Sequence, residues 1–240
     1  MVDGKMQIKI MSFNIQHCLN FVTREIDYDL MADTIKKCGA DIIGLQEVRN
    51  KGKSKDYKKQ AKIIAKKLGF YYYFAEAIRF NGKNPYGNAL ISRYPIKSAH
   101  TILIPEPETK KYNGYYETRC LLKATIDVGS ELNVLVCHFG LNPDEQENAV
   151  SVIVPNISAE RCVLMGDFNV QPDNAILNPI SQNLYDTADR FDSPKLSFPS
   201  DVPTVKIDYI FVSKDLVVSE ADIPGIVSSD HRPHTATINL

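Results

Sequence analysis

The stretch Val163-Leu164-Met165-Gly166-Asp167-Phe168-Asn169 is a short apolar run that ends in polar residues. Runs of this length that are rich in Ile, Leu and Val are typical of buried strands. The same design recurs in the runs at 7–13, 41–46 and 132–138 and around 206–212. A carboxylate, amide or imidazole at the end of a buried strand can point out of the core at one rim. The pattern therefore predicts one active site, assembled from polar groups of the whole chain.

Length and composition are those of an ordinary globular protein. The 240 residues are 44% hydrophobic and 24% charged, and one large core can absorb such a chain, so we expect a single domain over residues 1–240. The five cysteines are odd in number, form no CxxC pair and mostly lie in apolar runs. This predicts reduced thiols and a cytoplasmic protein. No signal-type apolar stretch follows Met1, and no segment approaches a membrane span.

Strand-like and helix-like patterns alternate early in the chain and again after residue 138. The expected strands lie near 7–13, 41–46, 70–75, 88–92, 100–104, 119–126, 132–138, 161–166, 206–212 and 234–239. The expected helices lie near 25–38, 56–68, 145–154 and 173–181. A hairpin turn is expected over 127–131. The loops 105–116 and 190–205, rich in Pro, Lys, Asp and Ser, are candidate substrate loops.

The segment 51–67 is strongly basic, although the whole chain has a net charge of −1. It carries eight lysines and one acid, Asp56, which makes the segment +7 and the remainder −8. Its apolar positions follow helical spacing, with Gly69 as the expected C-cap. The simpler interpretation is the solvated face of an amphipathic helix. The alternative is a basic rim that attracts a phosphorylated substrate, because the segment directly follows Glu47.

The polar residues at the strand ends offer oxygen ligands rather than thiolates. They are Asn14, Glu47, Asp167, Asn169, Asp208 and Asp230, accompanied by His138 and His231. This set suits a hard cation such as Mg²⁺ or Mn²⁺, which neutralises phosphate oxygens, rather than structural zinc. A histidine beside an aspartate can take or hold a proton. The combination indicates hydrolysis of a phosphate ester.

Each of these residues also has a simpler interpretation when it is taken alone. Asn14 can be a turn or capping residue, His138 a core histidine, and Asp208 a member of an ion pair. The dipeptide Asp230-His231 can be no more than the start of a loop. Their co-occurrence in order, over about 220 residues of the chain, favours the functional interpretation.

These residues resemble the motifs of the endonuclease/exonuclease/phosphatase superfamily, which includes deoxyribonuclease I, abasic-site endonucleases, deadenylases, neutral sphingomyelinases and inositol polyphosphate 5-phosphatases. The matching stretches are Ser12-Phe13-Asn14, Leu45-Gln46-Glu47-Val48, Leu90-Ile91-Ser92-Arg93-Tyr94-Pro95, His138, Gly166-Asp167-Phe168-Asn169, Ile207-Asp208-Tyr209-Ile210-Phe211 and Ser229-Asp230-His231-Arg232-Pro233. They cover nearly the whole chain. The resemblance implies an α/β (α+β) fold of the deoxyribonuclease I type, a four-layer sandwich of two packed mixed β-sheets flanked by helices, with the site at one end.

The resemblance also implies a metal site and phosphate contacts. Glu47, with Asn14, would hold Mg²⁺ or Mn²⁺ against the scissile phosphate. Asp230 would serve the metal site or hold the loop of His231. Arg119 and Asn88 are weaker candidates for contacts to the phosphate.

The catalytic roles implied by the resemblance fall on five residues. Asp167 would orient or deprotonate the attacking water, and Asn169 would bond a phosphate oxygen or the nucleophile. Asp208 would fix and charge-stabilise His231, and His138 would contact the phosphate and protonate the leaving oxygen. The choice of general base between Asp167 and His231 stays open.

The branch within the superfamily is left open by the sequence. The segment Val170-Gln171-Pro172-Asp173 is closer to the deadenylase, sphingomyelinase and small bacterial branches, and Lys206 stands where Arg is common. The chain has no Trp, unlike the 5-phosphatase motif, and it lacks the basic surface that a duplex-binding enzyme needs.

The predicted function is therefore a metal-dependent phosphoesterase, nuclease-like, with phosphodiesters favoured over monoesters. Its partner would be a phosphate-ester substrate, with short or single-stranded nucleic acid as one candidate. A lipid or small-molecule ester, as in sphingomyelinases, is the alternative, and a lipid would need an exposed apolar loop such as 112–116. A catalytically silent binding module on the same fold is the rival from another class. No protein partner is evident.

Overall fold

The computed structural model describes residues 6–240, and twelve strands in this part form two six-stranded sheets. The first sheet contains β1 (Gln7–Asn14), β2 (Ile42–Arg49), β3 (Tyr71–Phe80), β4 (Asn84–Ser92), β11 (Val217–Asp222) and β12 (His234–Asn239), in the order β11-β12-β1-β2-β4-β3. The second contains β5 (Ile96–Ile104), β6 (Arg119–Asp127), β7 (Glu131–His138), β8 (Cys162–Asp167), β9 (Leu184–Asp186) and β10 (Asp208–Ser213), in the order β5-β6-β7-β8-β10-β9. The first five residues of the expected domain, with the chain start, lie outside the described residues.

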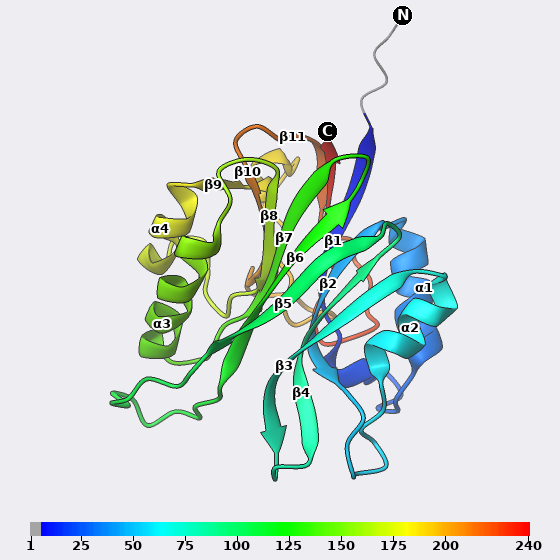
Figure 1. Ribbon diagram of the computed structural model, residues 1–240, viewed down its shortest axis with the longest axis vertical. Coiled ribbons are helices and arrows are strands. Elements are labelled where there is room, and N and C mark those ends of the chain that lie inside the picture. The colour runs from blue at the N-terminus through cyan, green and yellow to red at the C-terminus, as the bar shows by residue number, and fades with distance from the viewer. Residues whose placement is uncertain (1–5) are drawn as a thin grey trace, which may run out of the picture.

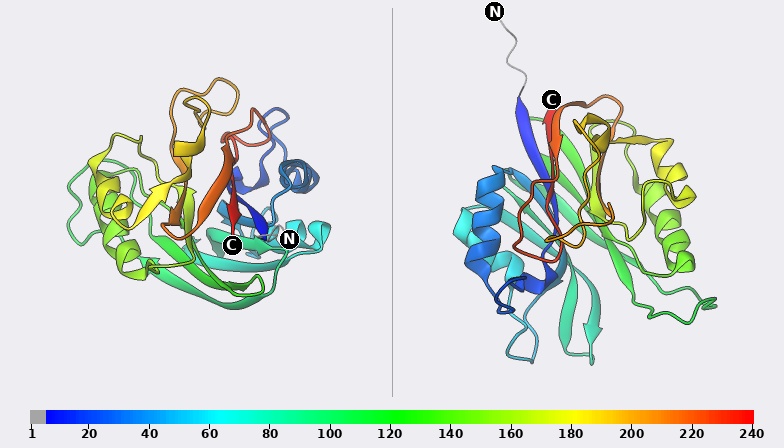
Figure 2. Two further views of the ribbon diagram at one scale, coloured as in Figure 1. Left: turned by 90° about the horizontal axis from the view of Figure 1, so that it is seen from above. Right: turned by 180° about the vertical axis from the view of Figure 1, so that it is seen from behind.

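Helices cover the outer face of each sheet, so the molecule has four layers (Figures 1 and 2). The first sheet carries α1 (Tyr28–Cys38) and α2 (Gln60–Leu68), and the second carries α3 (Pro143–Ile153) and the short α4 (Asn178–Ser181). Single 3₁₀ turns occur at 16–18, 154–156, 175–177 and 187–190. The predicted sandwich of two mixed sheets is confirmed. None of the helices within 6–240 combines the length and apolarity that a membrane crossing needs.

Each sheet contains one pair of parallel strands, connected through a helix. β1 pairs with β2 across α1, and β7 pairs with β8 across α3, whereas the other neighbouring strands are antiparallel. Because the two strands of a parallel pair point the same way, their carboxyl ends lie at the same edge of the sheet. In this molecule the two edges meet, since Asn14 at the end of β1 bonds Asp167 at the end of β8.

Apolar side chains fill the space between the sheets and both spaces under the helices. Along β1, Ile8 and Ile10 belong to the cluster between the sheets, whereas Met11 and Phe13 pack towards α1. Burial on both faces explains why most residues of the parallel strands are apolar, without a strict alternation of apolar and polar residues. The sheets approach closely at Gly44, where an added Cβ would lie 2.6 Å from Met165 Sδ.

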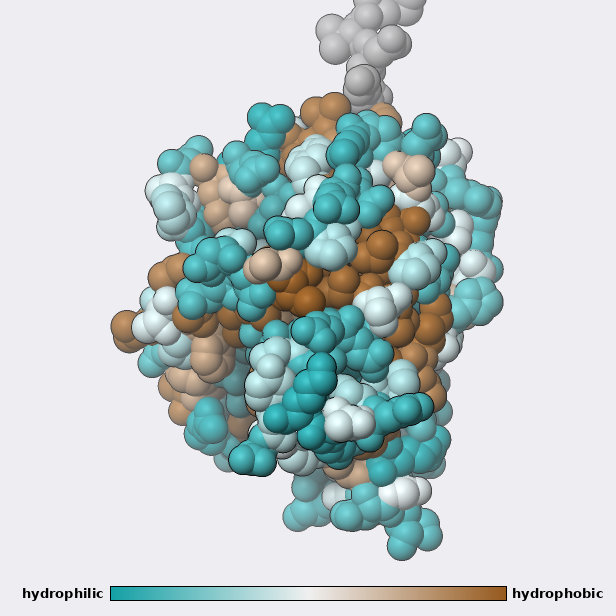
Figure 3. Space-filling model, turned by 90° about the vertical axis from the view of Figure 1, so that its left-hand side faces the viewer, coloured by the Kyte–Doolittle hydropathy of each residue, from teal (hydrophilic) through white to brown (hydrophobic). Residues whose placement is uncertain are grey.

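A third apolar cluster lies under α3 on the second sheet. It includes Ala149 and Ile153 of the helix and Leu135, Leu164 and Phe168 of the sheet side. The space-filling view of this side shows apolar surface in a band across the middle, between polar residues above and below (Figure 3). The five cysteines are free, and all except the half-buried Cys38 are buried.

Several expected elements differ from the observed ones; among the strands, β3 extends to Phe80, β4 begins at Asn84 and β5 begins at Ile96. α2 begins at Gln60 instead of residue 56, and the expected helix 173–181 is a 3₁₀ turn followed by the single turn of α4. The strands β9 and β11 were not predicted, because β9 has three residues and β11 is an edge strand with only Val218 and Ala221 buried. The predicted hairpin turn is confirmed, with Gly129 in the left-handed region at φ +85°.

Candidate active site

The ends of four strands bring predicted residues to one end of the sandwich. Asn14 ends β1, His138 ends β7 and Asp167 ends β8. His138 and Asp167 are partners in the parallel register of β7 and β8. Asp208 begins β10, which runs antiparallel to β8, so it lies opposite Asp167. The loop before β12 adds Asp230 and His231, which completes the predicted constellation.

Glu47 reaches this edge through a bulge in β2. The pairing of β2 with β4 shifts register between Leu45 and Val48, and Glu47 itself has φ +59°. A bulge re-aims a side chain, and a left-handed conformation outside glycine costs roughly 1–3 kcal/mol. The Oε1 atom of Glu47 accepts a hydrogen bond from Asn14 Nδ2 at 3.2 Å. The local strain thus directs the carboxylate towards the end of β1.

Asn14 connects the two sheets. Its buried Nδ2 donates to Glu47 Oε1 of the first sheet and to Asp167 Oδ2 of the second, at 3.2 and 3.1 Å. Its Oδ1 accepts from the backbone N–H of Gln16 at 3.1 Å. The amide therefore fixes the separation and orientation of two carboxylates that are 120 positions apart in the chain.

Asp208 and His231 form a buried pair. Asp208 Oδ2 lies 2.9 Å from His231 Nδ1, and the ring of Phe198 packs on the imidazole with centroids 4.8 Å apart. Burial opposes a charge on His231, but the carboxylates of Asp208 and Asp167 outweigh it and raise the pKa of His231 to about 10. His231 is therefore an imidazolium at neutral pH, with its Nε2 at 3.6 Å from Asp167 Oδ2.

His138 also faces Asp167 Oδ2, but unlike His231 it is neutral. Its Nε2 lies 3.5 Å from Asp167 Oδ2, and its Nδ1 lies 3.3 Å from Arg119 Nη1. Burial, the Arg119 guanidinium and the charge of His231 hold the pKa of His138 well below its ordinary value. Because a guanidinium only donates, Nδ1 is the acceptor and the proton lies on Nε2. His138 is therefore a neutral donor that points at the site.

Asp167 is the centre of this arrangement. Burial raises the pKa of Asp167 to about 7, although the positive charge of His231 opposes the shift. Its Oδ1 accepts from the backbone N–H of Asn169 at 3.0 Å. Asn169 has φ +51°, and its side chain donates to Phe139 O at 3.0 Å. The turn after β8 thus holds the aspartate in place, which positions a carboxylate that titrates near neutral pH.

Glu47 and Asp230 lie on the other side of Asn14 and form a more open, acidic part of the site. Burial raises the pKa of Asp230, and the negative charge of Glu47 adds to the rise. Ser229 Oγ donates to Asp230 Oδ1 at 3.1 Å. Within residues 6–240 neither carboxylate forms an ion pair with a lysine or arginine. Uncompensated carboxylate oxygens fit a hard divalent cation such as Mg²⁺ or Mn²⁺.

A different, deeply buried group has the spacing of metal ligands. Asp167, Asp208 and His231 offer ligand atoms that all lie within 4.8 Å of one another. The bond between Asp208 and His231 already uses two of these atoms. A cation there would have to replace that bond.

Arg119 and Asn88 lie behind His138. Arg119 Nη1 lies 2.8 Å from Glu117 Oε1 in an ion pair, and both side chains are largely buried. Asn88 Nδ2 donates to Cys120 O at 2.9 Å and so ties β4 to β6. Together with Tyr86 and His138 these residues line a small pocket. Arg119 is therefore fixed by Glu117 in contact with His138.

Three residues of the site were missed in the sequence. They are His17, Tyr86 and Glu117, which lie beside Glu47 or Arg119. Burial and the Arg49 charge lower the pKa of His17 to about 4. A signal for His17 was its position directly after the Asn14 motif, whereas nothing in the sequence distinguishes Tyr86 from other tyrosines.

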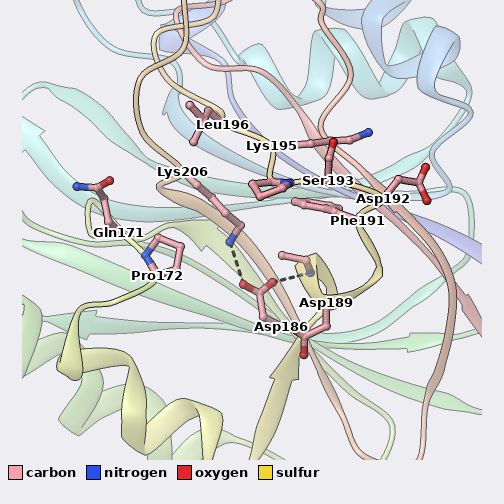
Figure 4. A pocket seen from close by; sticks show the side chains of 12 residues that line it. Gln171, Pro172, Asp186, Asp189, Phe191, Asp192, Ser193, Lys195, Leu196 and Lys206 are labelled. Atoms are coloured by element: carbon pink, nitrogen blue, oxygen red, sulfur yellow. Dashed lines mark hydrogen bonds and ion pairs between the residues drawn. The ribbon is translucent and has the colours of Figure 1, made fainter.

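Two pockets border the loop 190–205. One of about 600 Å³ is lined by Asn169 and Phe198, which join it to the site. The other, of about 450 Å³, is shown in Figure 4, where Lys206 and Asp186 point towards each other. Lys206 Nζ lies 2.9 Å from Asp186 Oδ2 and 3.3 Å from the centroid of the Tyr209 ring. Lys206 is thus committed to a structural ion pair, not to the site.

The aromatic residues of the loop 105–116 differ in their environments: Tyr116 is hydrogen-bonded, whereas Tyr112 and Tyr115 are exposed to solvent. The hydroxyl of Tyr116 donates to Asp144 and holds the loop against α3. Tyr112 and Tyr115 are 47% and 62% exposed, and Leu141 after β7 is 61% exposed. The rim on this side of the site therefore offers apolar surface to solvent.

Comparison with known proteins agrees with the geometry. The model of the Endonuclease/Exonuclease/phosphatase family matches residues 11–231. No curated protein matches the chain. A family protein from Leptotrichia buccalis is 23% identical over 97% of this chain and 100% of that chain, with a TM-score of 0.76.

Two further solved structures share the fold. A mannosyl-6-phosphatase from Bacteroides thetaiotaomicron is 17% identical over 97% of this chain and 100% of that chain, with a TM-score of 0.76. The human Nocturnin catalytic domain with bound sulfate anion is 18% identical over 97% and 93%, with a TM-score of 0.70. The family match indicates a phosphoesterase hydrolase. The chain belongs to the endonuclease/exonuclease/phosphatase family.

Proposed function

We propose that the protein is a divalent-metal-dependent phosphoesterase that hydrolyses a small phosphate ester. The observation that carries the proposal is the environment of Asp167 Oδ2, which lies 3.1 Å from Asn14 Nδ2, 3.5 Å from His138 Nε2 and 3.6 Å from His231 Nε2. A carboxylate with a pKa of about 7, between a neutral and a charged imidazole, suits proton transfer from water near neutral pH.

The proton-handling residues have distinct roles in this proposal. Asp167 accepts the proton of the attacking water, since His231 is already protonated at neutral pH. His231, held by Asp208, stabilises the negative charge that develops on the phosphate oxygens. His138 Nε2 donates to a phosphate oxygen or to the leaving oxygen. Asn169 orients the water or the phosphate from the turn after β8.

The cation belongs on the open side of the site in the proposed mechanism. Glu47 and Asp230 would hold Mg²⁺ or Mn²⁺, and Asn14 would keep the Glu47 carboxylate in place. The bound ion would neutralise charge on the phosphate oxygens. Arg119 would add a fixed positive charge behind His138, and Asn88 would keep that wall of the site in place.

The choice between monoester and diester decides how the function is tested. The sequence favours a phosphodiester, whereas the mannosyl-6-phosphatase of the same fold acts on a phosphate monoester. Purified protein would be incubated with p-nitrophenyl phosphate and with bis-p-nitrophenyl phosphate, each with Mg²⁺, Mn²⁺ or EDTA. We expect turnover with either cation and none with EDTA, and the better substrate identifies the ester class. Absence of metal-dependent turnover on both esters and on a panel of nucleotides, sugar phosphates and sphingomyelin would overturn the proposal.

A short single-stranded nucleic acid is the second candidate substrate, and the loop 50–59 favours it. The lysines of this loop (Lys51, Lys53, Lys55, Lys58 and Lys59) are exposed and form no ion pair in the described structure. Ser54 N bonds Asn84 Oδ1 at 3.0 Å, which fixes the loop against the β3–β4 hairpin (Figure 1). A fixed row of unpaired cations beside the site suits a substrate with several phosphates.

A further inference from the structure

His17 lies against Glu47 without a hydrogen bond to it. His17 Nδ1 is 4.0 Å from Glu47 Oε2, and both side chains are about a quarter exposed, 24% and 23%. A separation of 4.0 Å is too long for a hydrogen bond. Two ligands that each lie about 2.1 Å from one divalent cation are at most ~4.2 Å apart. The observed separation lies within this limit, so one cation can contact both atoms.

The backbone around His17 is strained. Gln16, His17 and Cys18 have φ values of +41°, +48° and +65°, three consecutive residues other than glycine in the left-handed region. Such conformations cost roughly 1–3 kcal/mol each and persist only where the surroundings impose them. Cys18 N bonds Ile15 O at 2.7 Å, which closes this tight turn directly after Asn14. The turn brings the imidazole back to the edge where Glu47 lies.

A buried glutamine holds His17 and the end of β2 together. Gln60, the first residue of α2, donates from Nε2 to His17 O at 2.6 Å and accepts at Oε1 from Arg49 N at 2.8 Å. Gln60 has no exposed surface. Because Arg49 is two residues after Glu47, this one side chain sets the position of His17 relative to the Glu47 carboxylate. The two hydrogen bonds of Gln60 therefore hold the backbone of His17 next to the end of β2.

We infer that His17 Nδ1 is a ligand, together with Glu47, of the divalent cation of this site. The inference rests on the metal dependence proposed above. An imidazole among carboxylates changes which cation binds best, because Mg²⁺ favours oxygen ligands whereas nitrogen ligands favour transition metals. The protein should therefore bind Mn²⁺ more tightly than Mg²⁺, and His17 should account for much of the difference.

The experiment compares the wild-type protein with His17→Asn and with His100→Asn. Asparagine tolerates the left-handed conformation, so the turn is retained. His100 is an exposed histidine on β5 and serves as the control. Mn²⁺ binding would be titrated by electron paramagnetic resonance, with Mg²⁺ as competitor, and pulsed measurements would detect ¹⁴N coupling to the bound ion.

We expect His17→Asn to weaken Mn²⁺ binding by about tenfold or more, to weaken Mg²⁺ binding much less, and to remove the ¹⁴N coupling. His100→Asn should change none of these. Gln60→Ala, which releases His17 without removing the imidazole, should give an intermediate loss. Unchanged Mn²⁺ affinity and unchanged nitrogen coupling in His17→Asn would overturn the inference, even if wild-type turnover depends on metal. Wild-type protein that neither binds Mn²⁺ nor hydrolyses any ester would instead overturn the proposed function itself.

Discussion

The units β1–α1–β2 and β7–α3–β8 have the same topology and contribute opposite environments to one site. The first ends in Asn14 and Glu47, and the Glu47 side chain is 23% exposed. The second ends in His138 and Asp167, whose side chains are 7% and 2% exposed. An open carboxylate can exchange a hydrated cation, whereas burial is what shifts a pKa by several units. In the proposed function, the first unit, which is the open half of the site, therefore serves the cation and the second serves the proton.

The largest effect is expected from the buried pair Asp208–His231, which faces Asp167 of the second unit. Asp208→Asn and His231→Ala should each lower kcat by about 10³-fold or more, because either change removes the stabilised imidazolium. The double variant should lose little beyond the worse single variant, since the two residues act as a unit. Steady-state kinetics at saturating metal tests this, with circular dichroism as the folding control. Full activity of His231→Ala would refute the division between the halves.

A change in the open half should alter the metal requirement more than the catalytic rate. Glu47→Gln keeps the shape of the side chain and removes its charge, so it should raise the Mn²⁺ concentration needed for half-maximal rate by about 10–100-fold. The rate at saturating Mn²⁺ should fall far less than in Asp208→Asn. Metal titrations of activity measure both quantities. A large loss of kcat with an unchanged metal requirement would place Glu47 in the proton-handling half.

Acid should destabilise the fold through a buried neutral histidine, His234, at the start of β12. Burial, together with the charge of Lys206, lowers the pKa of His234 to about 3. Below about pH 6.5 the unfolded state binds a proton that the folded state excludes, so the free energy of unfolding falls by up to about 1.4 kcal/mol per pH unit towards pH 3. Urea unfolding between pH 7.5 and 4.5 measures the slope. His234→Asn should flatten it by close to one proton, and an identical slope would contradict the assignment.

The pKa of His231 is raised rather than lowered, so His231 makes the free energy of unfolding depend on pH in the opposite direction. Its folded pKa of about 10 lies above the unfolded value, so its contribution to stability is complete below about pH 6.5 and is lost as the pH rises towards 10. Wild type should therefore lose stability in alkali more steeply than His231→Ala. The same unfolding series, extended to pH 10, includes this measurement.

The smallest effect is expected at the lysine-rich rim of the open half. Lys51→Gln with Lys53→Gln should raise KM for a single-stranded oligonucleotide a few-fold and reduce its salt slope by about 1.4, because each lost phosphate contact contributes about 0.7. Turnover of p-nitrophenyl phosphate should stay unchanged. The matched control, Lys62→Gln with Lys66→Gln, alters two exposed lysines of α2. Equal effects of both pairs would mean that the loop carries no substrate.

Much of the fold was predictable because its strands are buried on both faces. β8 reads as an unbroken apolar run, β1 and β7 are mostly apolar, and the polar residue that ends each strand marks the edge of the core. β9 and β11 were not predictable, since an edge strand buries too few side chains to leave a pattern. The start of α2 was predicted too early because the spacing of Tyr57 from the next apolar residues is helical. In the structure Tyr57 precedes the helix, and Arg49 Cζ lies 4.9 Å from the centroid of its ring.

The sequence by itself determined the residue types of the site and their order. A carboxylate or imidazole that follows a buried apolar strand is costly to bury, so it lies at the edge of the core. Only the tertiary structure decided which of them meet. His138 and His231 are the same residue type at nearly the same distance from Asp167, yet burial and Arg119 keep one neutral, whereas Asp208 and Asp167 keep the other charged. His17 likewise approaches Glu47 only through a left-handed turn and the clamp of Gln60. Charge state and proximity depend on neighbours brought from distant segments, and no local pattern in the chain records them.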